Sequence, residues 1–194
     1  QLLIMNKVEI LAETQAYIKK TFLDEGTGHD YFHIERVVTN AKKILETENA
    51  DPFLVELAAW THDVGDYKLH DGVDKSNELI TEFLQTLQVE QETIDKVLEI
   101  VSQVSFSKGN TPTTIEAKIV QDADRLDAIG AIGIARTFNF GGFKNNLMYH
   151  PDIQPKLNMT KEEYKKNNGT TINHFYEKLL LLKDLMNTET AKKI

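Results

Sequence analysis

The chain has 194 residues, which fits one domain, and its formal net charge is −8 at pH 7. This acidic balance disfavours a protein that binds nucleic acid along the phosphate backbone, because such proteins present a basic surface. The sequence has no cysteine, which excludes disulfides and thiolate chemistry, and no apolar run of about 18 residues, so we expect a cytoplasmic protein without a membrane partner.

Apolar residues recur with helical spacing along most of the chain, and no stretch alternates long enough to predict a strand. The first helix should end before Gly26 and the second should begin near His29. Asp51 and Pro52 suit the N-cap and first turn of a third helix. Further helices are predicted over residues 75–88, 90–105, 113–126, 128–140 and 170–187. The predicted fold is therefore all-α.

The chain shows no repeat and no low-complexity linker, so we expect a single domain over residues 1–194. Its core should cover about residues 28–140. An irregular segment at about 141–169, which contains glycines and prolines, is expected to act as a lid or to be a plain surface excursion. A C-terminal helix at about 170–190 completes the expected domain.

The third predicted helix ends on the pair His62-Asp63, which places an imidazole and a carboxylate at the end of an apolar run. Burying these groups is costly unless a partner satisfies them. The other His-Asp pairs, at residues 29–30 and 70–71, lie in turn-like sequence. A divalent metal ion would satisfy His62 and Asp63 at once, so we predict a metal site here.

Two residues on other apolar stretches, His33 and Asp124, could complete a site with two nitrogen and two oxygen ligands. Such a set suits Mn²⁺, Fe²⁺, Mg²⁺ or Zn²⁺ and leaves positions for water and substrate. His33 could instead be a hydrogen-bonded core residue. His29 could share a helix face with His33, but we favour His29 as a helix-start residue near the cleft.

Three segments of the sequence resemble the signature of the HD-domain phosphohydrolase superfamily: His33-x-x-Arg36-Val37, His62-Asp63 and Ala123-Asp124-Arg125-Leu126-Asp127. Longer stretches at residues 28–37, 122–136 and 174–179 resemble a bacterial branch of small, single-domain HD hydrolases that includes nucleotide pyrophosphohydrolases. The resemblance runs from about Gly28 to Met186 and implies an HD-domain helical bundle.

The resemblance implies a set of site residues. Its metal ligands fall on His33, His62, Asp63 and Asp124. One divalent ion is expected, because relatives that bind two metals have extra histidines between the His-Asp pair and the last aspartate, and here only His70 lies in that interval. Mn²⁺ is favoured, with Mg²⁺, Fe²⁺, Co²⁺, Ni²⁺ or Zn²⁺ as alternatives. The acidic residue that orients the attacking water in related hydrolases falls on Asp66, which could instead cap a turn.

The expected chemistry is metal-assisted hydrolysis of a phosphate ester or anhydride, with Asp66 accepting or orienting the water proton. Lys68 follows in the same loop and is predicted to assist. The cations predicted to bind the substrate phosphate are Arg36, Arg125 and Arg136. Arg36 and Arg125 could instead form structural ion pairs. Asp122 and Asp127 could orient histidine ligands or lie exposed.

The first prediction for function is an enzyme that releases pyrophosphate from a nucleoside triphosphate, and it rests on the resemblance. A 5′-nucleotidase or a phosphodiesterase is the alternative enzyme. A different class is a non-catalytic nucleotide-binding module that the metal only stabilises. The expected partner is a small phosphorylated substrate, a nucleotide, and the apolar helices are compatible with a homodimer.

Overall fold

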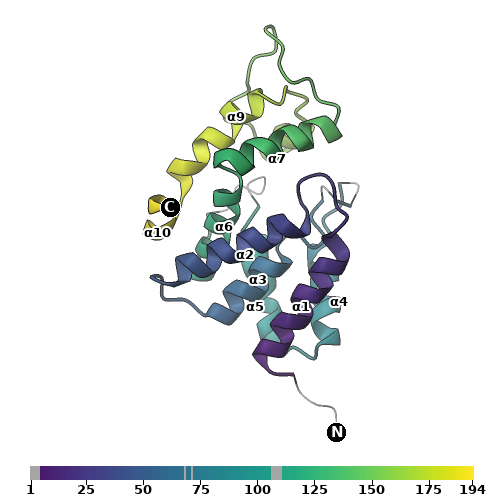
Figure 1. Ribbon diagram of the computed structural model, residues 1–194, viewed down its shortest axis with the longest axis vertical. Coiled ribbons are helices and arrows are strands. Elements are labelled where there is room, and N and C mark those ends of the chain that lie inside the picture. Colours follow the sequence, from purple (N-terminus) through teal and green to yellow (C-terminus); the bar gives the residue numbers. More distant parts are fainter. Residues whose placement is uncertain (1–4, 68, 71, 106–110) are drawn as a thin grey trace.

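The computed structural model describes residues 5–67, 69–70, 72–105 and 111–194. Every regular element within these residues is a helix, so the all-α prediction is confirmed (Figure 1). The elements are α1 (Lys7–Phe22), α2 (Tyr31–Leu45), α3 (Pro52–Thr61), α4 (Ser76–Thr86), α5 (Gln91–Ser102), α6 (Ile115–Asp127), α7 (Gly130–Phe143), α8 (Lys161–Lys166), α9 (Asn173–Glu177), the 3₁₀ helix η2 (Leu179–Leu185) and α10 (Glu189–Lys193).

Helices α1 to α6 pack as a bundle with α3 at its centre, in contact with α1, α2, α5 and α6. This position explains the apolar run in α3, where Leu57, Ala58 and Ala59 are fully buried. The start of α3 is the predicted one: the Asp51 carboxylate accepts hydrogen bonds from the first backbone N–H groups, and Pro52 occupies the first turn. The helix therefore carries residues 62 and 63 to the interior end of the bundle.

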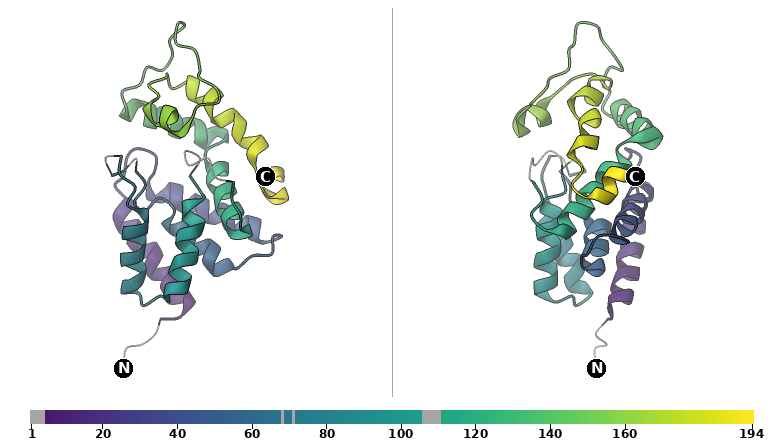
Figure 2. Two further views of the ribbon diagram at one scale, coloured as in Figure 1. Left: turned by 180° about the vertical axis from the view of Figure 1, so that it is seen from behind. Right: turned by 90° about the vertical axis from the view of Figure 1, so that its left-hand side faces the viewer.

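A second lobe, residues 130–186, lies at one end of the bundle and contains α7, α8, α9 and η2 (Figures 1 and 2). A tight corner joins α6 to α7. Gly130 has φ +68°, and a Cβ on Gly133 would lie only 2.3 Å from the Ala128 carbonyl oxygen, so both positions require glycine. The Arg136 Nε–H reaches back from α7 and donates to the Gly28 carbonyl at 2.7 Å.

The prediction of one continuous C-terminal helix over about 170–190 is wrong. The structure has α9, η2 and α10 instead, with an extended turn at Met186 (φ −62°, ψ 134°). The buried Asp122 carboxylate accepts hydrogen bonds from the backbone N–H groups of Asn187 and Thr188. These long-range hydrogen bonds replace helical ones, which local periodicity cannot reveal.

The segment expected to be irregular, about 141–169, contains the end of α7 and the short helix α8 as well as loops. Its first loop lies beside the chain that directly follows the segment, because the N–H groups of Thr171 and Ile172 donate to the carbonyls of Leu147 and Met148 at 2.9 and 3.0 Å. No helix in the part of the chain that the structure describes has the length and apolar character needed to cross a membrane.

Candidate metal centre

Three contacting helices bring the predicted metal ligands together. His33 lies in the first turn of α2, His62 and Asp63 directly follow α3, and Asp124 lies on α6. The start of α2 is fixed by Asp30, whose carboxylate accepts the His33 backbone N–H at 2.7 Å. These positions follow from local capping, whereas their meeting depends on the packing of α2, α3 and α6.

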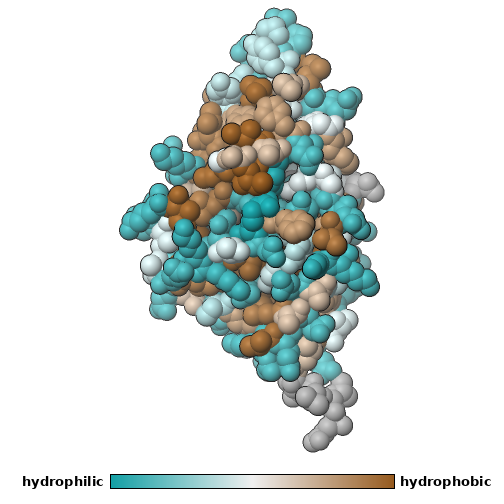
Figure 3. Space-filling view, in the orientation of Figure 1, coloured by the Kyte–Doolittle hydropathy of each residue, from teal (hydrophilic) through white to brown (hydrophobic). Residues whose placement is uncertain are grey.

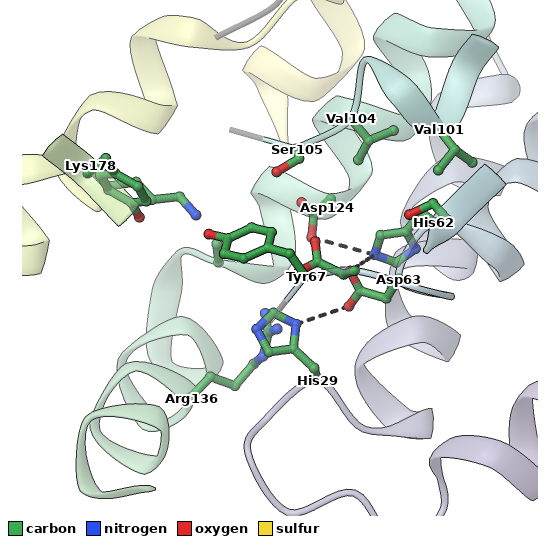
Figure 4. A pocket seen from close by; sticks show the side chains of 14 residues that line it. His29, His62, Asp63, Tyr67, Val101, Val104, Ser105, Asp124, Arg136 and Lys178 are labelled. Atoms are coloured by element: carbon green, nitrogen blue, oxygen red, sulfur yellow. Dashed lines mark hydrogen bonds and ion pairs between the residues drawn. The ribbon is translucent and has the colours of Figure 1, made fainter. Parts of the chain in front are cut away.

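The four side chains converge on a small region, and Figure 4 shows His62, Asp63 and Asp124 there. The His33 Nε2 atom lies 3.4 Å from Asp63 Oδ2 and 3.6 Å from Asp124 Oδ1. The His62 Nε2 atom lies 3.6 Å from Asp63 Oδ1 and 3.9 Å from Asp124 Oδ1. Ligand atoms about 2.1 Å from a common ion stand about 3 to 4.2 Å from one another, so these separations fit a shared divalent cation.

The two imidazole nitrogens that face this region have no hydrogen-bond partner among the described residues. The Nε2 atoms of His33 and His62 are both buried. Leaving a buried polar atom without a partner costs free energy. A metal ion bound between these nitrogens and the two carboxylates would remove that cost, so the residues fit the group that the sequence predicts.

The second nitrogen of each imidazole sets the ring's orientation. His62 Nδ1 lies 2.8 Å from the Ala59 carbonyl oxygen, and His33 Nδ1 lies 2.7 Å from Asp127 Oδ2. A carbonyl can only accept, and an ionised carboxylate likewise, so each Nδ1 carries the proton. In the neutral imidazole each Nε2 is then left with a lone pair aimed at the site, as a metal ligand requires.

Asp127 connects the histidine to two arginines. Its buried carboxylate accepts hydrogen bonds from Arg36 Nε at 2.6 Å and Nη2 at 3.1 Å, and from Arg136 Nη1 at 3.0 Å. Burial opposes charge on Asp127, but the hydrogen bonds from His33 and Arg36 outweigh burial and lower its pKa. Of the two aspartates whose roles were open, Asp127 therefore holds a histidine, whereas Asp122 binds the chain after η2.

The two carboxylates of the site favour the charged form. Burial opposes ionisation of Asp63, but His62 and His29 hold the pKa of Asp63 well below its usual range. Asp124 behaves similarly, because His62 and His33 outweigh its burial and lower its pKa. Both side chains therefore present anionic oxygens at neutral pH, which are suitable ligands for a hard divalent cation.

His29 lies beside the site but not on α2, because the helix begins after the N-cap Asp30. Its Nδ1 atom is 3.0 Å from Asp63 Oδ2, and its ring meets the His33 ring edge-on with centroids 5.7 Å apart. Ligand atoms of His29, His33 and Asp63 lie within 4.8 Å of one another. The expectation of a histidine before the helix and near the cleft is consistent with this placement.

A pocket opens over these ligands and lies between the bundle and the second lobe (Figure 4). His62, Asp63 and Asp124 form part of its lining. The other lining residues are His29, Asp66, Tyr67, Ser76, Val101, Val104, Ser105, Ala128, Arg136, Tyr164 and Lys178. The lining thus combines anionic ligands from the bundle with cations and aromatic rings from the second lobe and the loop after α3.

The structure separates the predicted polar residues into two groups. Asp66 and Arg136 line the pocket, whereas Arg36 and Arg125 are absent from its lining. Arg36 pairs with Asp127, and Arg125 donates to the Leu185 carbonyl, so their contacts favour the structural alternative. Lys68 lies outside the described residues.

Tyr164 and Lys178 are among the pocket residues that the sequence analysis did not assign to the site. Lys178 lies in the segment 174–179 that resembles the family, so a signal for it existed. Tyr164 belongs to a short helix in the irregular segment, where nothing in the sequence singled it out. Both residues reach the site only because the second lobe folds over the bundle.

The chain is similar to several known proteins. Residues 30–129 match the model of the HD domain. The Bacillus subtilis protein YpgQ is 38% identical, over 98% of this chain and 87% of its own length. The crystal structure of YpgQ in complex with ADP superposes with a TM-score of 0.72, and the match covers 94% of this chain and 86% of the YpgQ chain. An HD-superfamily hydrolase from Bacillus thuringiensis is 42% identical, with 97% and 88% covered and a TM-score of 0.71. A Lactobacillus plantarum structure, 37% identical, covers 98% and 89% with a TM-score of 0.87.

Proposed function

The chain belongs to the HD domain family, and from this premise we propose that it is a metal-dependent phosphohydrolase that acts on nucleotides. One observation carries the proposal: two buried imidazole nitrogens and two carboxylates face the same point, beneath a pocket whose lining also includes Arg136 and Lys178. The relative named an HD-superfamily hydrolase supports hydrolysis. The YpgQ structure in complex with ADP supports a nucleotide as the ligand.

We propose His33, His62, Asp63 and Asp124 as the ligands of one divalent ion, with Mn²⁺ favoured. When bound, such an ion supplies Lewis-acid chemistry, which lowers the pKa of a water molecule and polarises a phosphoryl oxygen. Asp127 and the Ala59 carbonyl hold the two histidines so that Nε2 faces the ion. The preorganised ligands avoid a reorientation cost on metal binding.

The residues around the ligands would position the water and the substrate. Asp66 follows the His-Asp pair on the loop after α3 and lines the pocket, so we propose that it orients the attacking water and accepts its proton. Arg136 and Lys178 would neutralise the phosphate charge. The rings of Tyr67 and Tyr164 also line the pocket and could stack on the base. Lys68 remains a predicted participant in catalysis.

The finer proposal is that the enzyme cleaves a nucleoside triphosphate into a monophosphate and pyrophosphate. The test is to incubate the protein with Mn²⁺ and a panel of nucleoside tri-, di- and monophosphates and to separate the products by ion-exchange chromatography. A His62→Ala, Asp63→Ala double variant is the control. Monophosphate and pyrophosphate should form with the wild type, and the double variant should form neither.

Other products would select an alternative. Free nucleoside from monophosphates would identify a 5′-nucleotidase, and cleavage of a phosphodiester would identify a phosphodiesterase. Binding of nucleotide without turnover in the presence of Mn²⁺, Mg²⁺, Co²⁺ and Fe²⁺ would favour a metal-stabilised nucleotide-binding module. The presence of Asp66 beside the complete ligand set favours turnover over this module.

A homodimer remains a proposal, as do a cytoplasmic location and the single domain over residues 1–194. Large apolar side chains are exposed on α7 and η2: Ile132, Ile134, Phe143, Leu180, Leu181 and Leu185. Figure 3 shows apolar surface gathered over this end of the molecule. Light scattering coupled to size-exclusion chromatography would give the mass of the particle, and a mass of one chain would exclude the dimer.

A further inference from the structure

Asp122 is a buried carboxylate that binds the chain after η2, and its hydrogen bonds among the described residues go to Asn187 and Thr188 rather than to a proposed metal ligand. It has no exposed surface. Its oxygens accept hydrogen bonds from Asn187 and Thr188: the two backbone N–H groups at 2.9 and 2.7 Å, the Asn187 amide at 2.8 Å and the Thr188 hydroxyl at 2.8 Å. We propose that Asp122 is a positioning residue that holds Lys178 against the substrate phosphate, an inference that rests on the proposed function.

The first step of the argument is the location of Asp122 on α6. It precedes the ligand Asp124 by two positions, so the two carboxylates leave the helix in different directions. The Asp124 side chain is 32% exposed and lines the pocket, whereas the Asp122 side chain is fully buried. One helix therefore carries a metal ligand on one side and an anchor for the C-terminal segment on another.

The second step is the connection between this anchor and the pocket. The helix η2 spans Leu179–Leu185, about 14 Å at the 3₁₀ rise. Its C-terminal end is bound to α6, because Arg125 donates to the Leu185 carbonyl and the Asn187 amide also donates to Gln121 at 3.0 Å. Leu182 is fully buried between the two ends. The helix therefore acts as a fixed spacer rather than a free arm.

The third step is the residue at the other end of the spacer. Lys178 directly precedes η2 and has φ −143° and ψ −60°, outside the helical region, which marks the break between α9 and η2. Its side chain lines the pocket, and Figure 4 shows its nitrogen turned toward the site. Burial raises the pKa of Asp124, and the positive charge of Lys178 joins the larger effects of His62 and His33 in lowering it.

These steps connect the two sides of the pocket through α6. Asp124 and Lys178 both line the pocket, and the bonds of Asp122 to Asn187 and Thr188 would hold the distance between them. A phosphate bound between a cation on the metal side and the Lys178 ammonium requires that distance to be held within about 0.5 Å. Loosening the anchor should therefore weaken phosphate binding without removing a ligand.

The experiment is a double-mutant cycle that measures the affinity for ADP in the presence of Mn²⁺ by isothermal titration calorimetry. Lys178→Met should weaken ADP binding about tenfold to a hundredfold. Asp122→Asn and Thr188→Val, each made singly, should weaken it about threefold to tenfold. In the Lys178→Met background neither anchor variant should weaken it further. Thr188→Val keeps the test available if Asp122→Asn does not fold.

Two controls separate positioning from general destabilisation. Thr190→Val alters the same C-terminal segment and should leave ADP affinity unchanged. The Thr190 hydroxyl bonds to Thr47 and Glu48 rather than to Asp122. The Mn²⁺ affinity of Thr188→Val should equal that of the wild type. The inference would be overturned if the losses of ADP affinity in the anchor variants added fully to the loss in Lys178→Met. Unchanged ADP affinity in both anchor variants would also overturn it.

The result also distinguishes this inference from the proposed function. If the anchor variants have no further effect in the Lys178→Met background but no nucleotide is hydrolysed, the positioning role stands and the proposed hydrolase activity fails. If nucleotide is hydrolysed but the anchor variants weaken ADP binding equally with and without Lys178→Met, the hydrolase activity stands and the positioning role fails. If the wild-type protein binds no ADP in the presence of Mn²⁺, the inference fails.

Discussion

His33 and Asp127, which are 94 positions apart in the chain, share a hydrogen bond of 2.7 Å between Nδ1 and Oδ2. Both side chains are almost fully buried, at 1% and 2% exposure. The bond fixes the tautomer in which His33 Nε2 faces Asp63 and Asp124. Asp127 also binds Arg36 and Arg136, so the orientation of a proposed metal ligand depends on a network that joins α2, α6 and α7.

Asp127→Asn should therefore weaken metal binding although Asp127 is not itself a proposed ligand. An amide can donate as well as accept, so the His33 ring loses its fixed tautomer and its anionic partner. We expect Mn²⁺ affinity to fall about tenfold to a hundredfold, measured by calorimetry. Asp51→Asn, at the N-cap of α3, is the matched control and should keep wild-type affinity. Equal affinity in Asp127→Asn would contradict the orienting role.

Removal of divalent ions should destabilise the protein, because the two unpaired Nε2 atoms and the two carboxylates then lose their common partner. At an ion concentration of about 100 times Kd, binding raises the free energy of unfolding enough to raise the Tm by about 5 to 10 °C for a chain of this size. Differential scanning calorimetry with EDTA and then with excess Mn²⁺ measures the change. The His62→Ala, Asp63→Ala variant should show no shift; a shift of similar size there would place the ion elsewhere.

Asp66→Asn should separate catalysis from metal binding. The side chain lines the pocket but lies outside the proposed ligand set, so its loss removes proton transfer and leaves the metal site. We expect kcat for nucleotide hydrolysis to fall about 10²- to 10⁴-fold with unchanged Mn²⁺ affinity. Asp74→Asn, in the same connection between α3 and α4, serves as the control because Asp74 accepts the Ser76 N–H instead. A kcat close to the wild-type value would assign Asp66 to the turn alone.

Gly65 lets the loop that carries Asp66 close against the start of α4. Its φ is +81°, and an added Cβ would lie 2.4 Å from the Ser76 nitrogen and 2.5 Å from the Lys75 carbonyl carbon. Gly72 has a similar φ of +86° but open space around it. Both alanine variants should lose about 1 to 2 kcal/mol to backbone strain, and Gly65→Ala should lose about 1 to 3 kcal/mol more from the close contact. Urea denaturation measures both; equal losses would show that the contact relaxes.

The parts of the fold that the sequence predicts are those determined locally. Asp51 and Pro52 begin α3 as expected, and apolar spacing locates α1 to α7 within a few residues. The C-terminal region was mispredicted as one helix because Asp122, over 60 residues away, bonds to Asn187 and Thr188. Periodicity reports which side chains are apolar and carries no information about such distant backbone partners.

The site shows the same division. The residue types and their order along the chain predict His33, His62, Asp63 and Asp124 as metal ligands, and the packing of α2, α3 and α6 brings these residues together. The roles of the arginines could not be read from the sequence, because Arg36 and Arg136 share one buried carboxylate while only Arg136 also lines the pocket. The position of the second lobe over the bundle depends on long-range packing, so the place of Tyr164 in the pocket could not be predicted from the sequence.

The central claim is that one divalent ion, held by His33, His62, Asp63 and Asp124, is required for nucleotide hydrolysis. The most direct measurement titrates metal-free protein with Mn²⁺ and records, on each sample, bound ion by electron paramagnetic resonance and the initial rate of pyrophosphate release from a nucleoside triphosphate. The account predicts that the rate rises in proportion to bound ion and saturates at one ion per chain, and that the His62→Ala, Asp63→Ala variant gives neither signal. Turnover before any ion is bound, or turnover by that variant, would contradict it.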